Sequence, residues 1–406
     1  MKALSIAPQP FFSPRGTPLS VYYRSLILSE LGVEVDLVTY GQGSDVDIPG
    51  LRIRRIPNFK FLGAVKTGPS MLKLFLDVFV FFTTLWLLIV EDYDFVLAHE
   101  ESVFFCTFLK PFFRFKLVYD MHSSLPQQLS NFQYDKYPMW IKLFNFLEEA
   151  SLKASDAVIT ICPDLHNYAK KRLAKDQKLM LIENSLFEPV RIVLTRKTAR
   201  QTPQKVEPLP MDAQDQAQLV VYAGTLESYQ GIDILIRSFA LVVQKQHDAR
   251  LLIVGGTAEQ VAFYSRLTEN LGISQYVTFT GRVSQIQAQR YSHKASVLVS
   301  PRSKGTNTPL KIYEQLASGI PLVATNIYSH VQVLTPDVAF LVDPDPAAMA
   351  QGILSALDSK GEAAAKTANA RNLYRSAYSR TIYKDKIRRL LNFLSSFTSN
   401  HNTQNE

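Results

Sequence analysis

Short runs of apolar residues alternate along most of the chain with longer segments whose apolar residues recur at helical spacing. Continuous apolar runs of this length are typical of parallel strands whose sheet is covered by helices on both faces. The pattern therefore predicts an α/β fold with two parallel sheets. The runs are ALSIAP, EVDLVTY, LRIRRI, DFVLAH, KLVYD, DAVITI and KLMLI, followed by QLVVYAG, RLLIVGG, YVTFTG, SVLVSP, IPLVAT and AFLVDP.

A polar segment at residues 185–217, rich in proline and glutamine and without sustained periodicity, separates the two series of runs. A chain of 406 residues is also too long for one ordinary core. We predict one Rossmann-like domain over residues 1–184, a linker over 185–217 and a second Rossmann-like domain over 218–375. The chain should end with a helix at 376–396 and a disordered tail at 397–406.

Open α/β sheets bind their ligands beyond the carboxyl ends of the strands. Two such domains joined by a flexible linker create a cleft where both sets of strand ends meet. We therefore expect the functional residues to come directly after strands.

Composition and charge narrow the class of protein. The chain is 47% hydrophobic and 20% charged, as globular proteins are, and its net charge of +8 suits an anionic partner but also an ordinary basic soluble protein. A nucleic-acid-binding protein is least favoured because no basic stripe is interleaved with aromatic residues.

Cys106 and Cys162 are far apart, so we predict no disulfide framework, no zinc site and a reducing compartment. The N-terminal segment MKALSIAPQPFF is interpreted as a first strand and not as a signal peptide.

Residues 71–90, MLKLFLDVFVFFTTLWLLIV, have the length of a membrane span. Lys73 and Asp77 interrupt the segment and no second span exists, so we predict a buried or membrane-touching helix rather than a transmembrane one. Basic residues beside apolar ones at 59–90 and 112–116 also predict salt-sensitive, peripheral contact with an anionic membrane. Packing of the same helices into the core, with solvated lysines, is the alternative.

The segment SPRSKGTNTPLKIYEQLASGIPLVATN, residues 300–326, is the richest in candidate chemistry. A strand leads into a polar loop and then into a helix, with Thr308 as the predicted N-cap and Pro309 as the first helical residue. The free amides and the dipole of a helix start favour an anion, and Lys311 adds a positive charge. Glu314 lies on the same face and could accept hydrogen bonds from two ribose hydroxyls. The segment predicts a nucleotide site, and an exposed lysine and glutamate on an amphipathic helix are the alternative.

Other candidate residues also follow predicted strands. Gly16 and Thr17 open a helix, where a glycine allows a phosphate or a sugar to approach the backbone, although a simple strand–helix turn has the same pattern. His122 follows the KLVYD strand and has a side chain suited to acid–base or hydrogen-bonding roles. Gly224 and Gly281 follow strands of the second domain.

Taken together, these motifs resemble the retaining glycosyltransferases of family 4, which have the GT-B fold. The resemblance covers nearly the whole chain and is carried by PRGTPLS, DMHSS, SDAVITICPDL, IENS, VVYAGTLESYQGID, LLIVGG, FTGRV and TPLKIYEQLASGIPLVAT. It implies two Rossmann-like domains that face each other across a cleft, with the last helix crossing back to the N-terminal domain.

The resemblance also implies an activity. The enzyme would transfer a sugar from a UDP- or GDP-linked donor, bound by the second domain, to a glycan or lipid-linked acceptor on the first, with retention of the anomeric configuration. It would need no metal and no other cofactor. It would be cytoplasmic, including the cytoplasmic face of a membrane.

Individual residues can be carried over by position. Glu314 matches the second glutamate of the family's E-x7-E signature, which binds ribose, and Gly16 matches the glycine that faces the donor phosphates. His122 matches the histidine that contacts the transferred sugar, and Gly281 lies in the segment near the nucleobase. The catalytic candidates are His122, Lys311 and Glu314. The donor-binding candidates are Gly16, Thr17, Gly224, Gly281, Arg282, Arg302, Asn307, Thr308, Pro309, Leu310, Lys311 and Glu314. The acceptor-side candidates are His99, Glu100, Asp120 and His122.

The chain departs from the family pattern at three positions. Thr306 stands in place of the first glutamate of E-x7-E, Thr225 in place of a frequent arginine, and Gln230 in place of a usual lysine. The basic pair that usually binds the diphosphate is therefore missing. Lys311 and Arg302 are the nearby cations that can replace it.

These departures leave two alternatives open. One is a non-catalytic nucleotide-sugar-binding or scaffold protein of a glycan-assembly pathway. The other is a nucleotide-sugar epimerase of related fold, for which Glu100 and Glu101 would be the acid–base candidates. The acidic triplets Asp45/Asp47, Asp92/Asp94 and Asp343/Asp345 match no family ligand, so we expect no essential metal.

Overall fold

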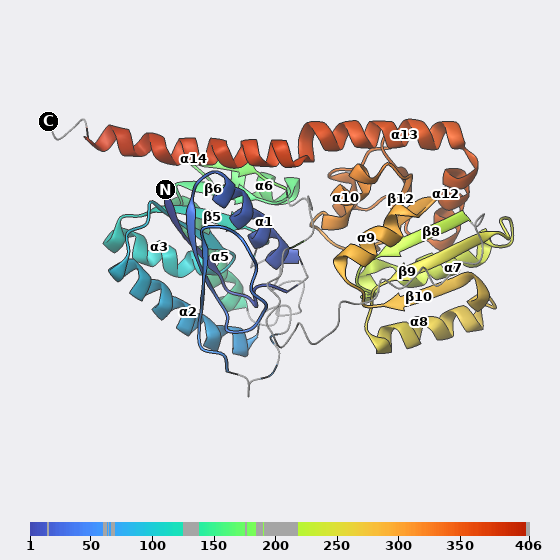
Figure 1. Ribbon diagram of the computed structural model, residues 1–406, viewed down its shortest axis with the longest axis horizontal. Coiled ribbons are helices and arrows are strands. Elements are labelled where there is room, and N and C mark those ends of the chain that lie inside the picture. The colour runs from blue at the N-terminus through green and yellow to red at the C-terminus, as the bar shows by residue number, and fades with distance from the viewer. Residues whose placement is uncertain are drawn as a thin grey trace. The chain divides into compact units, whose positions relative to one another are not determined.

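The structure is a computed structural model of the 406-residue chain. It describes residues 1–13, 16–59, 63, 65, 70–124, 138–174, 177–183, 190 and 218–402. The chain forms two compact units (Figure 1): unit 1 comprises Met1–Asn184, Val190–Val193 and Arg380–Glu406, and unit 2 comprises Ser185–Pro189 and Leu194–Ser379. The predicted linker, residues 185–217, lies outside the described residues except for Val190.

Unit 1 contains one parallel sheet in the order β3-β2-β1-β4-β5-β6-β7. Every apolar run of the first half forms one of these strands. The central strands β1, β2, β4, β5 and β6 are almost wholly buried, whereas the edge strands β3 and β7 are mostly half-buried. The order reverses between β1 and β4, which is the position where sheets of this kind bind ligands. The strands are β1 (Lys2–Ala7), β2 (Glu34–Thr39), β3 (Leu51–Arg55), β4 (Phe95–His99), β5 (Lys116–Met121), β6 (Ala157–Thr160) and β7 (Lys178–Leu181).

Helices cover both faces of this sheet. α2, α3 and α5 lie along one face, and α1 and α14 pack together on the other (Figure 1). α1 begins at Gly16, two residues before the Pro18 at which proline's preference for the first turn would place its start. The helices are α1 (Gly16–Glu30), α2 (Met71–Val90), α3 (Ser102–Phe113), α5 (Pro138–Ala154), α6 (Pro163–Lys170) and α14 (Arg380–Asn402).

The last helix in the described part of the chain, α14, belongs to unit 1, although the strands and helices directly before it belong to unit 2. It begins at Arg380 rather than 376, because a π-helical turn at Tyr374–Tyr378 and an extended Ser379 interrupt the helical path. It ends at Asn402, so it takes in part of the tail expected to be disordered, and residues 403–406 lie outside the described part of the chain. Lys384 pairs with Glu30 of α1 at 3.0 Å.

Unit 2 contains a second parallel sheet, in the order β10-β9-β8-β11-β12-β13, which reverses between β8 and β11. The apolar runs of the second half form all of its strands. These are β8 (Gln218–Ala223), β9 (Ala249–Val254), β10 (Val277–Gly281), β11 (Val297–Ser300), β12 (Leu322–Thr325) and β13 (Phe340–Val342).

Helices α7, α8 and α12 pack on one face of the second sheet and α9, α10 and α13 on the other. The short helix α11 follows β12. The bounds are α7 (Ile232–Val242), α8 (Ala258–Asn270), α9 (Gln285–His293), α10 (Leu310–Ser318), α11 (Tyr328–Val331), α12 (Pro346–Asp358) and α13 (Lys360–Leu373).

One aspartate in each acidic triplet has a local structural contact. Asp45 pairs with Arg55 at 2.7 Å. Asp94 accepts a hydrogen bond from the backbone N–H of Lys2. Asp345 caps α12 by accepting from two backbone amides. Each triplet therefore contains one aspartate with a structural role.

Candidate functional site

Two loops at the switch point of unit 2, together with helix α10 that follows the second loop, carry most of the donor-binding candidates. One follows β8, from Gly224 to Gly231, and the other follows β11, from Pro301 to Pro309. The loops pack closely, because a Cβ on Gly231 would lie 1.9 Å from the carbonyl oxygen of Pro301. Gly231 also has a φ of 70°, which favours glycine, so both the turn and the contact require this residue.

The second loop ends at the start of α10, where the structure corrects the predicted cap. Pro309 is extended, with ψ of 135°, and is itself the N-cap, so the helix begins at Leu310 and Thr308 lies outside it. No side chain caps the helix. The hydroxyl of Thr308 is buried and makes no hydrogen bond to the described residues. The amides of the first turn are therefore uncapped by side chains.

The ammonium group of Lys311 lies in the first turn of α10 and is buried. Its Nζ is 4.1 Å from the ring centroid of Tyr222 on β8, and it makes no hydrogen bond or ion pair to the described residues. Burial, and secondly the charge of Arg302, lower the pKa of Lys311 to about 7. A buried cation with only an aromatic ring beside it destabilises the protein unless an anion joins it.

Arg302 holds the second loop in shape. Its Nε donates to the carbonyl of Lys304 at 2.7 Å, and its Nη1 donates to the carbonyl of Asn307 at 3.2 Å. The guanidinium lies 5.3 Å from the ring centroid of Tyr229 in the first loop. Burial lowers the pKa of Arg302, and no carboxylate among the described residues pairs with it.

His330 was not predicted from the sequence. It is buried on α11, with Nδ1 2.8 Å from the carbonyl of Thr325 and Nε2 3.0 Å from the hydroxyl of Ser300. Burial, followed by the charges of Lys311 and Arg302, lowers the pKa of His330 to about 4. The ring is therefore neutral at pH 7, with Nδ1–H donating to Thr325 and Nε2 accepting from Ser300.

Glu314, one turn after Lys311, faces a different neighbour. Its carboxylate is half-buried and accepts a hydrogen bond from Gln289 of α9, near His293. Burial raises the pKa of Glu314, against the effect of those two residues. Lys311 and Glu314 share one helix face without pairing, so both remain available to a ligand.

The positions that depart from the family pattern lie on the same loops. Thr225 is exposed, and its carbonyl accepts the hydroxyl of Tyr222 at 2.6 Å. The Oε1 of Gln230 is buried without a hydrogen-bond partner among the described residues. Thr306 is exposed. The remaining donor-side candidates are Gly224, Gly281 and Arg282, of which Gly224 and Arg282 are exposed and Gly281 is half-buried.

In unit 1, the structure brings three acceptor-side candidates together at the ends of β4 and β5. His99 Nδ1 lies 3.1 Å from His122 Nε2 and 3.3 Å from Asp120 Oδ2, and His122 Nε2 lies 3.6 Å from Asp120 Oδ1. All three side chains are buried. Ser5 of β1 contacts His99 Nε2 at 3.1 Å, which fixes the other side of that ring.

Arg24 of α1 completes this network and was not predicted. Its Nε and Nη2 donate to the two carboxylate oxygens of Asp120 at 2.9 and 3.0 Å. Burial would raise the pKa of Asp120, but Arg24, His122 and His99 hold it well below its usual range. Tyr383 of α14 covers the pair, with its ring centroid 5.5 Å from the Arg24 guanidinium.

His99, Asp120 and His122 each offer one ligand atom within 4.8 Å of the others, a spacing that a metal ion could bridge. However, both oxygens of Asp120 already accept hydrogen bonds from Arg24. The added cation would lie beside a guanidinium. The geometry is therefore that of a hydrogen-bonded network that orients His122.

Glu100 directly follows His99 of this network and lies near two further carboxyls, those of Asp77 and Glu101. It has a φ of 52°, an uncommon conformation for a residue with a side chain, and such strain is concentrated at functional sites. Thr17 contacts its carboxylate at 3.5 Å. Burial raises the pKa of Asp77 to about 6, and burial together with Glu100 and Asp77 raises that of Glu101 to about 8.

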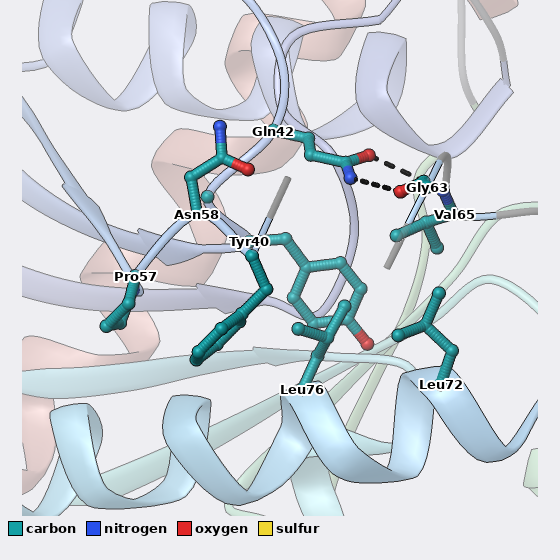
Figure 2. Close-up of a pocket in the computed structure, with 10 residues that line it drawn as sticks. Tyr40, Gln42, Pro57, Asn58, Gly63, Val65, Leu72 and Leu76 are labelled. Atoms are coloured by element: carbon teal, nitrogen blue, oxygen red, sulfur yellow. Dashed lines mark hydrogen bonds between the residues drawn. The ribbon is translucent and has the colours of Figure 1, made fainter. Parts of the chain in front are cut away.

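A small pocket of about 240 Å³, which includes open solvent, lies near these carboxyls at the ends of β2 and β3 (Figure 2). Tyr40 forms one wall, between Leu72 and Leu76 of α2, and its hydroxyl donates to Asp77 at 2.6 Å. Gln42 donates to the carbonyl of Gly63 at 2.7 Å and so closes the rim. From the sequence, Asp77 was interpreted only as an interruption of an apolar helix.

Comparisons with known proteins agree with this architecture. The model of Glycosyltransferase Family 4 matches residues 15–186, and that of Glycosyl transferases group 1 matches residues 217–359. The phosphatidyl-myo-inositol mannosyltransferase of Mycobacterium tuberculosis is 30% identical over 152 residues. That alignment covers 35% of this chain and 39% of the mannosyltransferase, so the chain matches about two fifths of the length of this relative.

Solved structures of similar fold cover nearly all of the chain. Sucrose-phosphate synthase from Thermosynechococcus elongatus has a TM-score of 0.72 at 20% identity and covers 97% of this chain and 99% of its own. Anabaena HepE, solved with UDP, has a TM-score of 0.70 at 14% identity and covers 97% and 100%. These likenesses establish a common fold of two Rossmann-like units. Because the two family models match both units, the chain belongs to the family 4, group 1 glycosyltransferases, with the GT-B fold.

Proposed function

We propose that the protein is an enzyme that transfers a hexosyl group from a nucleoside-diphosphate sugar, with retention of configuration and without a metal. The observation that carries this proposal is the buried, unpaired ammonium of Lys311 at the uncapped start of α10. A diphosphate would supply the missing anion and accept hydrogen bonds from the helix amides.

The charges in this part of unit 2 favour a leaving diphosphate. Lys311 and Arg302 are both cationic in the presence of an anion, and the helix dipole has the same sign at this end. As the bond to the sugar breaks, negative charge grows on the diphosphate, and these groups stabilise it more than they stabilise the intact donor. They replace the basic pair of the family pattern, whose positions are occupied here by Thr225 and Gln230. They also supply the positive charge that a metal would otherwise provide.

Glu314 is proposed to bind the ribose of the donor. Its half-buried carboxylate has a neutral partner, Gln289, that two ribose hydroxyls could join or displace. UDP is one candidate nucleotide, because structures of HepE contain UDP and UDP-glucose. GDP is the other.

His122 is proposed to contact the transferred sugar, with Asp120, Arg24 and His99 as positioning residues. Gly16 is proposed to face the donor phosphates: a Cβ there would meet nothing within 4 Å, so the fold itself does not require a glycine. The acceptor would be a glycan or a lipid-linked saccharide bound by unit 1, and the enzyme would act in the cytoplasm. The family match favours transfer over the non-catalytic and epimerase alternatives, and donor hydrolysis or transfer by the purified protein would exclude the non-catalytic one.

A thermal-shift screen of nucleotide-sugars tests the donor assignment. A donor present at about 100 times its Kd should stabilise the protein by about 2.7 kcal/mol. Glu314→Ala should weaken the binding of that donor by about 1.5–3 kcal/mol, the scale of a hydrogen bond to a charged group. Glu269→Ala, an exposed change at the end of α8, is the matched control. Equal donor affinity in the two folded variants would remove Glu314 from the ribose site.

His122→Ala should reduce turnover and leave UDP or GDP binding nearly unchanged, because His122 belongs to unit 1 whereas Lys311, Arg302 and the helix start proposed to bind the diphosphate belong to unit 2. Turnover and nucleotide affinity would be measured on the same preparation, after the melting temperature shows that the variant is folded. The exposed His247→Ala variant is the control. If nucleotide affinity fell as much as turnover did, His122 would belong to the nucleotide site instead.

A further inference from the structure

One side of α2 is apolar and exposed along the whole helix. Its opposite side, formed by Leu76, Val80, Thr84 and Leu87, packs on the sheet. By length and composition, α2 is the one helix in the described part of the chain that could cross a membrane, yet only 22% of its apolar stretch is buried. The exposed stripe contains Leu74, Phe75, Val78, Phe82, Trp86 and Ile89, which are 45–65% exposed.

The stripe continues onto α3 and α5 through aromatic contacts. Phe81 of α2 packs edge-on against Phe105 of α3, with 5.7 Å between ring centroids. Phe104 of α3 lies 6.4 Å from Phe144 of α5. Beyond these contacts, Phe108, Phe112 and Phe146 are 63%, 69% and 68% exposed. We call the exposed side of α2, α3 and α5 the aromatic face. Large contiguous apolar surfaces of this kind mark interaction sites.

The charges around the aromatic face are basic. Lys73, Lys142 and the C-cap Arg114 make no ion pair to the described residues. The acids of the same helices are already engaged: Asp77 accepts from Tyr40, Glu148 from Ser124 and Glu149 from Lys153. The face therefore combines apolar side chains with cations that have no ion-pair partner among the described residues, whereas each acid named here already accepts a hydrogen bond.

We propose that the aromatic face inserts into one leaflet of an anionic lipid bilayer. The cations suit anionic headgroups, and the aromatic and aliphatic side chains suit the boundary between headgroups and acyl chains. This deepens the proposed function, because a lipid-linked acceptor is presented at the same surface. The test below measures lipid binding and not sugar transfer, so the two proposals can fail separately.

The same observations argue against two other occupants. α2 does not cross the bilayer, because its inner side is packed on the sheet, Asp77 is bonded to Tyr40, and Glu91 after its last residue pairs with Lys2 at 2.5 Å. A second copy of the chain, placed face to face, would bring two sets of the same unpaired cations together, which is unfavourable.

The structure also changes the expected response to salt. Surface electrostatics alone would give association that high salt abolishes. Here the exposed apolar side chains outnumber the unpaired cations, and their burial is insensitive to screening. The prediction of salt-sensitive contact was based partly on two basic residues of the segment 59–90, Lys60 and Lys66. Both lie outside the described residues. We therefore expect high salt to weaken binding without abolishing it.

Trp86 provides a direct reporter, because it lies on the exposed stripe and the chain has only one other tryptophan, Trp140. In the W140F variant, phosphatidylcholine vesicles that contain phosphatidylglycerol should shift the emission of Trp86 to shorter wavelength. Lipids brominated on the acyl chain should quench it. At high salt, the affinity should fall but the quenching at saturation should remain. Vesicles of phosphatidylcholine alone should bind more weakly.

Phe82→Asp in the W140F background should reduce the vesicle affinity by about ten- to a hundredfold, the scale of losing one buried aromatic side chain. Phe263→Asp is the matched control, because Phe263 is 66% exposed on α8 of unit 2 and Phe82 is 60% exposed. The control should bind like its parent. Melting temperature and the nucleotide-induced thermal shift show that each variant is folded.

Three results would overturn the proposal. The first is unchanged Trp86 emission with anionic vesicles at low salt. The second is an equal effect of Phe82→Asp and Phe263→Asp. The third is a lipid-free dimer in size-exclusion chromatography that Phe82→Asp dissociates, which would assign the face to a second copy of the chain.

Discussion

Replacing Lys311 with methionine is expected to weaken UDP or GDP binding by about 2–5 kcal/mol, because the diphosphate loses its buried cationic partner. The same change should stabilise the ligand-free protein by about 1–3 kcal/mol, since an unsatisfied buried ammonium is replaced by an apolar side chain of similar length. Calorimetric titration and thermal unfolding measure the two effects. Few single substitutions should change affinity and stability so strongly in opposite directions.

The pH dependence provides a second readout for the same variant. With a pKa of about 7 in the ligand-free protein, Lys311 loses its charge above neutrality, so the affinity for the diphosphate should fall as pH rises. Between about pH 7 and the ordinary lysine pKa, the unfolded chain binds more protons than the folded one. The wild-type protein should therefore gain stability over that range, and the advantage of methionine should shrink.

Lys304→Met is the matched control, because this lysine is exposed in the same loop. Its nucleotide affinity should stay close to that of the wild type. If Lys311→Met bound nucleotide as the control does, the buried ammonium would have no role at the diphosphate.

Asp120→Ala is expected to lower the free energy of unfolding by about 3–5 kcal/mol, because it leaves the buried guanidinium of Arg24 without a counter-charge. The two side chains are 1% and 0% exposed, so solvent cannot compensate for the loss. Since the pKa of Asp120 is depressed in the folded state, its contribution is present above the unfolded carboxyl pKa and is lost in acid. Denaturant unfolding near neutral pH measures the change.

The surface pair of Asp45 with Arg55 provides the comparison. Asp45 is 54% exposed, and Asp45→Ala should cost at most about 1 kcal/mol. A double variant, Arg24→Met with Asp120→Leu, should recover much of the stability lost in Asp120→Ala, because it removes both charges. Similar losses for Asp120→Ala and Asp45→Ala would mean that the buried pair does not stabilise the fold.

The strands were predictable because each one is encoded by a local run of apolar residues, and the strand order places the predicted loops at the two switch points. Lys311 and Glu314 could be found because they lie within one turn of a recognisable helix. Arg24 could not be found in this way, since its partner Asp120 is 96 residues away and only the folded sheet brings them together.

The helix at residues 71–90 shows a different limit. Its composition indicated an apolar helix, but apolar residues on every side of the helix hide which side packs on the sheet. The same absence of periodicity hid the role of Asp77, whose hydrogen bond to Tyr40 depends on the position of β2. The roles of Arg24 and Asp77 shared one available signal in the sequence, which is a charged residue placed among the apolar residues of a helix.

The position of α14 has a consequence for the order in which the protein is made. Tyr383 covers Arg24, and Lys386 pairs with Glu183, so unit 1 lacks a helix that is synthesised only after unit 2. Until then, the side of α1 that α14 covers stays open to water. Unit 1 can therefore reach its final stability only after the whole of unit 2 has been translated, and the nascent chain must be protected from aggregation for that time.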